Sequence, residues 1–330
     1  MIAALALGGY TIVVACCAPA LLVPLTRGGA SVRPGLAAWL SAMASAVVAA
    51  AIAVALITQA AVTAWPTLTR VVCQQVAGTT CTPQVYRSAL YSAGVAILAA
   101  VIILAALAAL WRYGRRTRRT VTRTRLHARA VLLAGRELAG TGAVVLDDPR
   151  PVAYCVAGRP AAIVVTSGAL ALLDSRQLAA VLAHERAHLA GRHHLLVTVT
   201  RGLAAALPGV PLFTRGAEEV ARLAELAADD TAARSVGRSA LVAALLAIAT
   251  GSVTGGTAAS TAGSTAGGTA GPGARPALAA ASLAVPARVE RLLDPPARRT
   301  AAMAGLALAL VSAVLIALPA ALAAVAGAAG

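Results

Sequence analysis

Four long stretches of this 330-residue chain carry no charged side chain, and they constrain its fold more than any other feature. They cover about residues 1–25, 35–64, 88–111 and 301–328. A helix needs roughly 20 apolar residues to cross a bilayer, so each stretch predicts a transmembrane helix. The first has no basic residues before it and is too long for a signal-peptide core, so we expect it to be a retained anchor.

The distribution of arginine predicts how these spans are oriented. The chain has no lysine, and eight arginines crowd into 112–129, directly after the third span. Cytoplasmic segments beside a span carry such an excess. We therefore expect this segment in the cytoplasm, and the N-terminus and the loop 66–87 outside. The net charge of +16 is also typical of nucleic-acid-binding proteins, but the position beside a span favours membrane topology, and no nucleic-acid partner is expected.

Two cysteines share the loop that is expected outside. Cys73 and Cys81 form a disulfide in our prediction, because such bonds persist in oxidising compartments. The alternative, two unpaired thiols, stays open, since the pairing rests on the compartment alone.

Nearly all the polar chemistry lies between the third and fourth spans, and no acidic residue precedes Glu137. The chain thus divides into three spans over 1–112, a cytoplasmic domain over 113–300 and a fourth span over 301–330. The fold class predicted is an α-helical membrane protein with four transmembrane helices plus a mainly helical α+β metallopeptidase domain of the zincin type.

Within the domain, local patterns predict the elements in order. Val- and Ile-rich runs bounded by turn residues predict short strands, and Asp174 with Gln177 predicts the capping box of a helix that ends at Gly191. A run of Gly, Ala, Ser and Thr without periodicity predicts a flexible segment. One apolar segment, interrupted by an arginine and two prolines, is either buried or interfacial, and the sequence leaves this open. The ranges are helix 121–138, strands 143–146, 152–156 and 161–166, helix from 174, apolar segment 195–213, helices 217–235 and 239–250, flexible segment 251–273 and a short amphipathic piece 287–293.

The domain contains an H-E-x-x-H motif that runs from His184 to His188. Positions i and i+4 lie on one face of a helix, so the two imidazoles converge on one metal ion. In this motif the glutamate, here Glu185, acts as general base on the water that a zinc ion activates. We therefore expect Zn²⁺ as cofactor and Glu185 as the catalytic residue.

A catalytic zinc takes three protein ligands, so a third one must come from elsewhere. Glu225 and Asp229 are four residues apart on a predicted helix and share one face. We expect Glu225 to be the ligand, Asp229 to hold the ring N–H of a ligand histidine, and Arg222 to orient Glu225. Glu218, Glu219 and Asp229 remain alternative ligands, and so does the interpretation that these charges form ion pairs on an exposed helix face.

Two further histidines follow the motif. His193 lies beyond the predicted helix end, and we expect His193 and His194 to be solvated loop residues, with hydrogen bonding to an oxyanion as the alternative. A serine nucleophile finds little support, because Ser167 lies in no G-x-S-x-G elbow. A pairing of Cys155 with a histidine would explain fewer residues than the H-E-x-x-H motif does.

The segments 153–158, 163–170 and 178–189, together with the E-x-x-x-D element from Glu225 to Asp229, resemble the peptidase core of membrane gluzincins. These include the HtpX and CAAX-protease group and the BlaR/MecR antibiotic sensors. In that family the glutamate is the third zinc ligand and the aspartate supports the site. Three spans before the domain and one after it resemble the BlaR/MecR arrangement. We expect no counterpart of the large penicillin-binding sensor domain that follows the last span in those sensors, because Gly330 comes directly after the fourth span.

The sequence therefore predicts a membrane-integral zinc endopeptidase, with a protein or peptide as substrate and the lipid bilayer as its surroundings. We expect a multi-pass protein of a plasma membrane, and the lysine-free, alanine- and arginine-rich composition points to a GC-rich bacterial genome. The alternative function is a signal-transducing membrane protein with minor or lost peptidase activity. A transporter is disfavoured because the spans lack ionisable residues.

Overall fold

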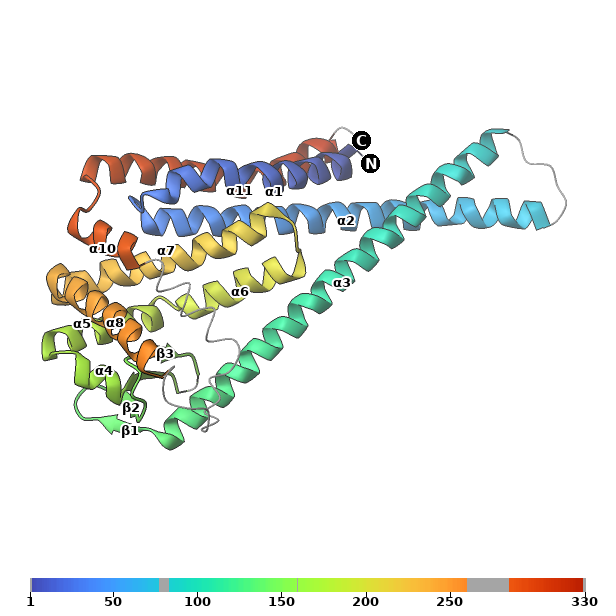
Figure 1. Cartoon of the computed structure of the whole chain (residues 1–330). Helices are drawn as coiled ribbons and strands as arrows, with labels where there is room; N and C mark the ends of the chain where they lie inside the picture. The colour runs from blue at the N-terminus through green and yellow to red at the C-terminus, as the bar shows by residue number, and fades with distance from the viewer. Residues whose placement is uncertain (1, 77–82, 159, 260–284, 329–330) are drawn as a thin grey trace.

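The structure of the chain, a computed structural model, describes residues 2–76, 83–158, 160–259 and 285–328 (Figure 1). Four helices in this part are long and apolar enough to cross a membrane: α1 (Ile2–Arg27), α2 (Val32–Val76), α3 (Pro83–Ala134) and α11 (Arg298–Ala328). Helices α1, α2 and α11 run side by side with both termini at one end, and α3 leaves them at an angle toward a small sheet (Figure 1). Large apolar side chains such as Ile12, Ile97 and Ile316 are two-thirds exposed, as expected of surfaces that face lipid.

The two helices that follow α1 extend beyond their predicted spans. Helix α2 continues to Val76 and α3 starts at Pro83, so much of the predicted loop 66–87 is helical. The Cys73 side chain and Cys81 lie outside the described residues, and their pairing stays a prediction. Helix α3 is unbroken from the third span through the arginine-rich segment.

The predicted helix 121–138 ends four residues early, at Ala134. The reason lies at Gly135, where an added β-carbon would come within 2.1 Å of the Val144 side chain. The chain passes Val144 so closely that only glycine fits, and the residues that follow form a strand instead of another helical turn.

A four-stranded sheet lies at the end of α3. Its strands are β1 (Arg136–Leu138), β2 (Ala143–Leu146), β3 (Ala153–Val156) and β4 (Ala162–Thr166), in the order β1-β2-β4-β3. β2 and β4 are parallel, and the outer strands are antiparallel to their neighbours. Every residue of β4 is buried, which explains its continuous apolar sequence. β3 is an edge strand, so one row of its backbone groups is unpaired within the sheet.

Besides the four long apolar helices, the described part contains six helices: α4 (Ser167–Leu172), α5 (Ser175–Ala190), α6 (His193–Ala206), α7 (Pro211–Val236), α8 (Arg238–Ala259) and α10 (Val285–Leu293). The capping box of Asp174 with Gln177 and the end of α5 at Gly191 are confirmed. Helix α8 continues through residue 259, into the predicted flexible segment, whose remainder 260–273 lies outside the described residues.

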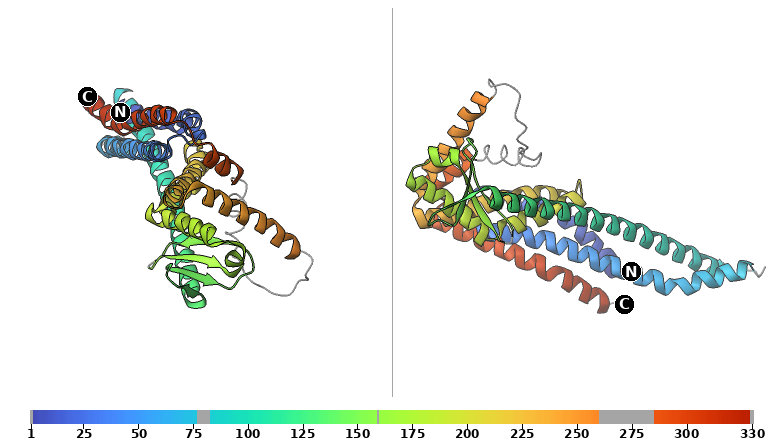
Figure 2. Two further views of the ribbon diagram at one scale, coloured as in Figure 1. Left: turned by 90° about the vertical axis from the view of Figure 1, so that its left-hand side faces the viewer. Right: turned by 90° about the horizontal axis from the view of Figure 1, so that it is seen from below.

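Helix α7 connects the spans with the sheet region. Its first half contributes Leu212, Phe213 and Leu223 to an apolar core shared with α1, α2 and α11. Its last turns contribute Ala232 to a second core beneath the sheet, which is built mainly by α5, α8 and β4. The left view of Figure 2 shows α7 between the bundle and the sheet. The two ends of α7 are therefore anchored in different cores, which fixes the position of the turns between them.

Candidate metal centre

Helix α5 presents both histidines of the H-E-x-x-H motif on one face. His184 and His188 are one turn apart, largely buried, and their Nε2 atoms lie 3.1 Å from each other. The capping box fixes where α5 begins, and thereby which residues face α7. Two imidazole nitrogens thus point into the same small space.

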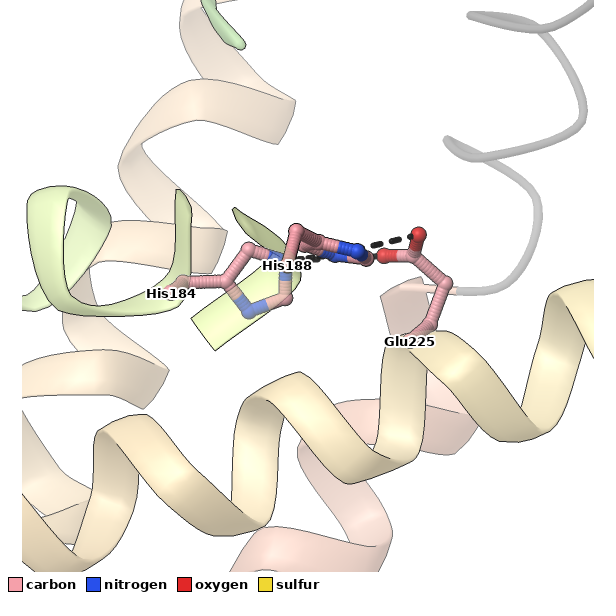
Figure 3. A group of neighbouring side chains, drawn as sticks. All are labelled: His184, His188 and Glu225. Carbon is pink, nitrogen blue, oxygen red and sulfur yellow. Dashed lines mark hydrogen bonds and ion pairs between the residues drawn. The ribbon is translucent and has the colours of Figure 1, made fainter. Parts of the chain in front are cut away.

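Glu225 reaches this space from the middle of α7 (Figure 3). Its Oε2 lies 3.6 Å from Nε2 of His184, and its Oε1 lies 3.4 Å from Nε2 of His188. The structure therefore brings together the three residues that the sequence suggested as ligands. Of the described His, Cys, Asp and Glu side chains, these three form the group able to hold a metal ion.

The spacing of these atoms fits zinc. With Zn–N and Zn–O distances of about 2.0–2.1 Å and tetrahedral angles, ligand atoms are about 3.3–3.4 Å apart. The two imidazole nitrogens are 3.1 Å apart, each lies 3.4–3.6 Å from one of the two carboxylate oxygens of Glu225, and one ligand atom from each residue lies within 4.8 Å of the others. Two imidazole nitrogens and a carboxylate oxygen are a donor set that suits a zinc ion, which would take the place of the protons that otherwise join these groups.

Asp229 lies one turn beyond Glu225 and approaches the other side of His184. Its Oδ1 is 3.0 Å from Nδ1 of His184, although the ring N–H is not aligned for a regular hydrogen bond. Burial lowers the pKa of His184, but the contacts with Asp229 and Glu225 outweigh burial and raise this pKa to about 9. Asp229 thus favours a proton on Nδ1, and a bound metal ion would replace the proton on Nε2, which faces the centre.

Glu185 is buried beside the two histidines and does not belong to the ligand group. Burial raises the pKa of Glu185 above its ordinary value, against the effect of the neighbouring imidazoles. The thiol of Cys155 on β3 lies within hydrogen-bonding reach of this carboxylate, and burial together with Glu185 raises the pKa of Cys155 to about 12. Glu185 therefore lies between the metal ligands and the edge strand.

Arg288 on α10 is a functional candidate that the sequence reasoning missed. Its Nε and Nη2 donate to the two carboxylate oxygens of Asp229 at 2.7 and 2.6 Å, and its Nη1 lies 3.2 Å from Oε2 of Glu225. It is buried, and it holds both carboxylates in place. A signal was present in the sequence, because the amphipathic piece carries two arginines on one face, Arg288 and Arg291, and the predicted helix 217–235 carries two adjacent acids, Asp229 and Asp230.

The expected role of Arg222 is corrected by the structure. Arg222 donates to Glu219 at 2.8 Å and to the backbone carbonyl of Thr26, away from Glu225. Glu225 comes three residues after Arg222 and faces α5, where it contacts the two histidines. Arg222 instead faces the end of α1. Arg222 and Glu219 thus connect α7 with the end of α1. Glu218 is exposed. Neither Glu218 nor Glu219, the alternative ligands, lies at the centre.

The expectation for His193 is also corrected. His193 is the first residue of α6, is buried, and its Nδ1 lies 3.1 Å from Nδ1 of His188. Arg192 before it adopts a left-handed conformation (φ 49°), which starts α6 directly after α5 and turns His193 back onto His188. Burial lowers the pKa of His193 to about 4, so its ring is neutral and able to accept the Nδ1–H of His188. His194 is only half-buried and lies away from the ligands.

Comparisons with known proteins found similarity to peptidases. Residues 117–210 match Peptidase family M48, a segment that includes the sheet and α5 but ends before Glu225. The "Protease HtpX homolog" of Acidiphilium cryptum (strain JF-5) is 40% identical over 80 residues, which are 23% of this chain and 28% of that protein. The chain therefore aligns with less than a third of this relative's length. No solved structure matches significantly. Together the two matches support a membrane-associated metallopeptidase.

Proposed function

We propose that the chain is a membrane-integral, zinc-dependent endopeptidase. The observation that carries the proposal is the convergence of His184, His188 and Glu225, which offer the two nitrogens and one carboxylate that a catalytic zinc takes, within 4.8 Å of one another. The match to Peptidase family M48 over the segment that holds the two histidines supports the same reaction class.

Each residue has a distinct task in this proposal. His184, His188 and Glu225 hold the ion, which, when bound, polarises the substrate carbonyl and makes a water molecule more acidic. Glu185 takes the proton from that water and later delivers it to the leaving amine. Because burial raises the pKa of Glu185, this carboxylate is a better proton acceptor near neutral pH than an ordinary glutamate.

The edge strand offers a place for the substrate backbone. β3 pairs with β4 on one side only, and it packs against α5, which carries Glu185. An extended peptide adds to such an edge by main-chain hydrogen bonds. We infer that the substrate lies along β3, in the region predicted from the sequence, with its scissile bond next to Glu185.

The test combines metal content with proteolysis in the detergent-purified chain. We expect about one zinc per chain, loss of zinc in Glu225→Ala, and retention of zinc without proteolysis in Glu185→Gln. Glu218→Ala is the matched control, because Glu218 is an exposed acid on the same helix, and it should change neither property. Undiminished proteolysis by Glu185→Gln would refute the mechanism. A folded parent without zinc would favour the signal-transducing alternative.

We also propose the orientation that the arginines suggest, with the N-terminus outside and the metal centre in the cytoplasm of a bacterial cell. The arginine-rich half of α3 leads directly from the third span into the sheet, so these charges and the metal centre share one side of the membrane. Reporter fusions after residues 76 and 250 should give opposite sides. The BlaR/MecR-like arrangement of the spans favours a regulatory protein as the substrate.

A further inference from the structure

The hairpin between α6 and α7 is the part of the candidate peptidase region that reaches deepest along the spans. Its connecting turn and flanking residues, 202–214, contain no charge, whereas Arg201 and Arg215 bracket them. Figure 1 shows this hairpin pointing along α2, away from the sheet. Both bracketing arginines are exposed. This pattern, an apolar tip between two cations, is typical of a segment whose tip enters lipid while its ends remain at the headgroups.

The packing of α7 fixes how deep the tip lies. Gly216 is so close to Trp39 and Met43 of α2 that an added β-carbon would clash with both. Leu212 and Phe213 join the same apolar core. Trp39 and Met43 are about 6 and 12 Å into the charge-free stretch that starts at Gly35, at 1.5 Å per residue. The first turns of α7 therefore lie beside a part of α2 that belongs to its apolar span.

Helix α3 contacts the hairpin from the other side, at the end of the third span. Nε of Arg112, the first arginine after the third span, donates to the carbonyl oxygen of Ala206 at 3.0 Å. Gly202 lies directly against Tyr113. The hairpin thus fills the wedge between α2 and the departing α3, and its last α6 carbonyl meets the arginine at the end of a span.

The turn itself has few polar groups that need water. Pro208 and Pro211 have no N–H, and the N–H groups of Leu207, Val210 and Phe213 donate to backbone carbonyls. Backbone groups at membrane depth must find such partners, because lipid offers none. The exposed residues at the tip are Pro208 and Gly209, and neither has a polar side-chain atom.

We propose that residues 202–214 form a re-entrant hairpin that inserts its tip, Leu207 to Val210, into the acyl region of the leaflet nearest the metal centre. The hairpin belongs neither to the spans nor to a solvated loop. The hairpin also determines how far the metal centre lies from the membrane, because α6 starts at His193, next to the centre, and α7 carries the ligand Glu225. At 1.5 Å per residue, these two residues lie about 12 and 15 Å from Arg201 and Arg215. A substrate therefore has to present its cleavage site within about 15 Å of the bilayer surface.

The proposal is tested with the full chain in phosphatidylcholine and phosphatidylglycerol vesicles, using lipids brominated at different depths as quenchers of tryptophan fluorescence. The variants Leu207→Trp and Val210→Trp each add one tryptophan at the tip, and the parent signal from its three tryptophans is subtracted. Two variants are used so that a misfolded one does not decide the outcome. Leu104→Trp is the control in lipid, since Leu104 is 66% exposed within a span, and Leu133→Trp is the control in water, since Leu133 is 89% exposed near the sheet.

We expect the added emission at both tip positions to be shifted to the blue and strongly quenched, most by bromine near the headgroup end of the acyl chains. Leu104→Trp should be quenched more by bromine further along the chains. Quenching at the tip no stronger than for Leu133→Trp would overturn the insertion, and stronger quenching by the deepest bromine would overturn the shallow placement. Neither readout depends on metal binding or proteolysis, so the result is separate from the proposed function.

Discussion

The replacement Arg288→Met tests whether a buried cation holds the centre together. Arg288 makes two short hydrogen bonds to Asp229, which is fully buried, and contacts Glu225. Methionine keeps much of the apolar stem but leaves two carboxylates next to each other without a counter-charge. At an effective dielectric constant of about 20, unit charges about 4 Å apart interact by about 4 kcal/mol. Breaking a buried ion pair from one side costs about 3–5 kcal/mol, in agreement with this value.

The matched control is Arg291→Met, one turn later on α10. Arg291 pairs with Asp230 at 2.7 Å and donates to the carbonyl of Gly29, but Asp230 is about one-third exposed. Solvent therefore takes over much of the lost interaction, and we expect a cost of about 1 kcal/mol or less.

The assay is thermal unfolding in detergent at one scan rate, with and without a zinc chelator. In the chelator, Arg288→Met should lower the Tm by roughly 6 °C or more, since about 2–4 °C corresponds to 1 kcal/mol in domains of 150–250 residues. With zinc bound the loss should be smaller, because the ion supplies the positive charge that the variant lacks. Equal shifts for the two variants without metal, or a larger loss for Arg288→Met with zinc than without, would refute the reasoning.

Three shorter predictions follow. Asp174→Ala removes the capping box of α5 and should destabilise the chain by about 1 kcal/mol; an unchanged unfolding temperature would contradict it. The raised pKa of about 12 keeps Cys155 protonated, so at pH 8 its alkylation, followed by mass spectrometry, should be on the order of a thousandfold slower in the folded chain than in the unfolded one. His193→Ala should weaken zinc affinity about 10–100-fold, measured by competition with a coloured chelator, whereas His194→Ala should not; equal affinities in both variants would rule out the contact with His188.

The local parts of the structure were predictable because they depend on neighbouring residues. The capping box of Asp174 and the stop at Gly191 define α5, and the i, i+4 spacing then fixes how His184 and His188 face. The four apolar stretches correspond to long helices because an apolar sequence of that length leaves the backbone few alternatives.

Other features depended on contacts between distant segments. Glu225 was suggested from its spacing to Asp229, but the partner of both carboxylates, Arg288, is about 60 residues further along and belongs to a different helix. The position of His193 depends on the left-handed conformation of Arg192, which sequence patterns rarely reveal, because few non-glycine residues adopt it. The end of α3 at Ala134 depends on the contact of Gly135 with Val144. Each of these arises from tertiary packing.

The packing of α7 leads to a last prediction, that the metal centre does not survive without the spans. Glu225 is held on a helix whose preceding turns bury Leu212, Phe213, Val220 and Leu223 against α1 and α2. Burying each such side chain contributes about 1.5–3 kcal/mol, so the four together contribute roughly 6–12 kcal/mol, as much as the whole stability of a typical domain. A chain that starts at residue 113 exposes this face, and α7 should lose its fixed position relative to α5. We expect such a chain to bind zinc far more weakly than the full chain in the same detergent, with α5 still helical by circular dichroism. Zinc affinity equal to that of the full chain would show that the sheet region alone positions Glu225, and that the spans serve only as an anchor.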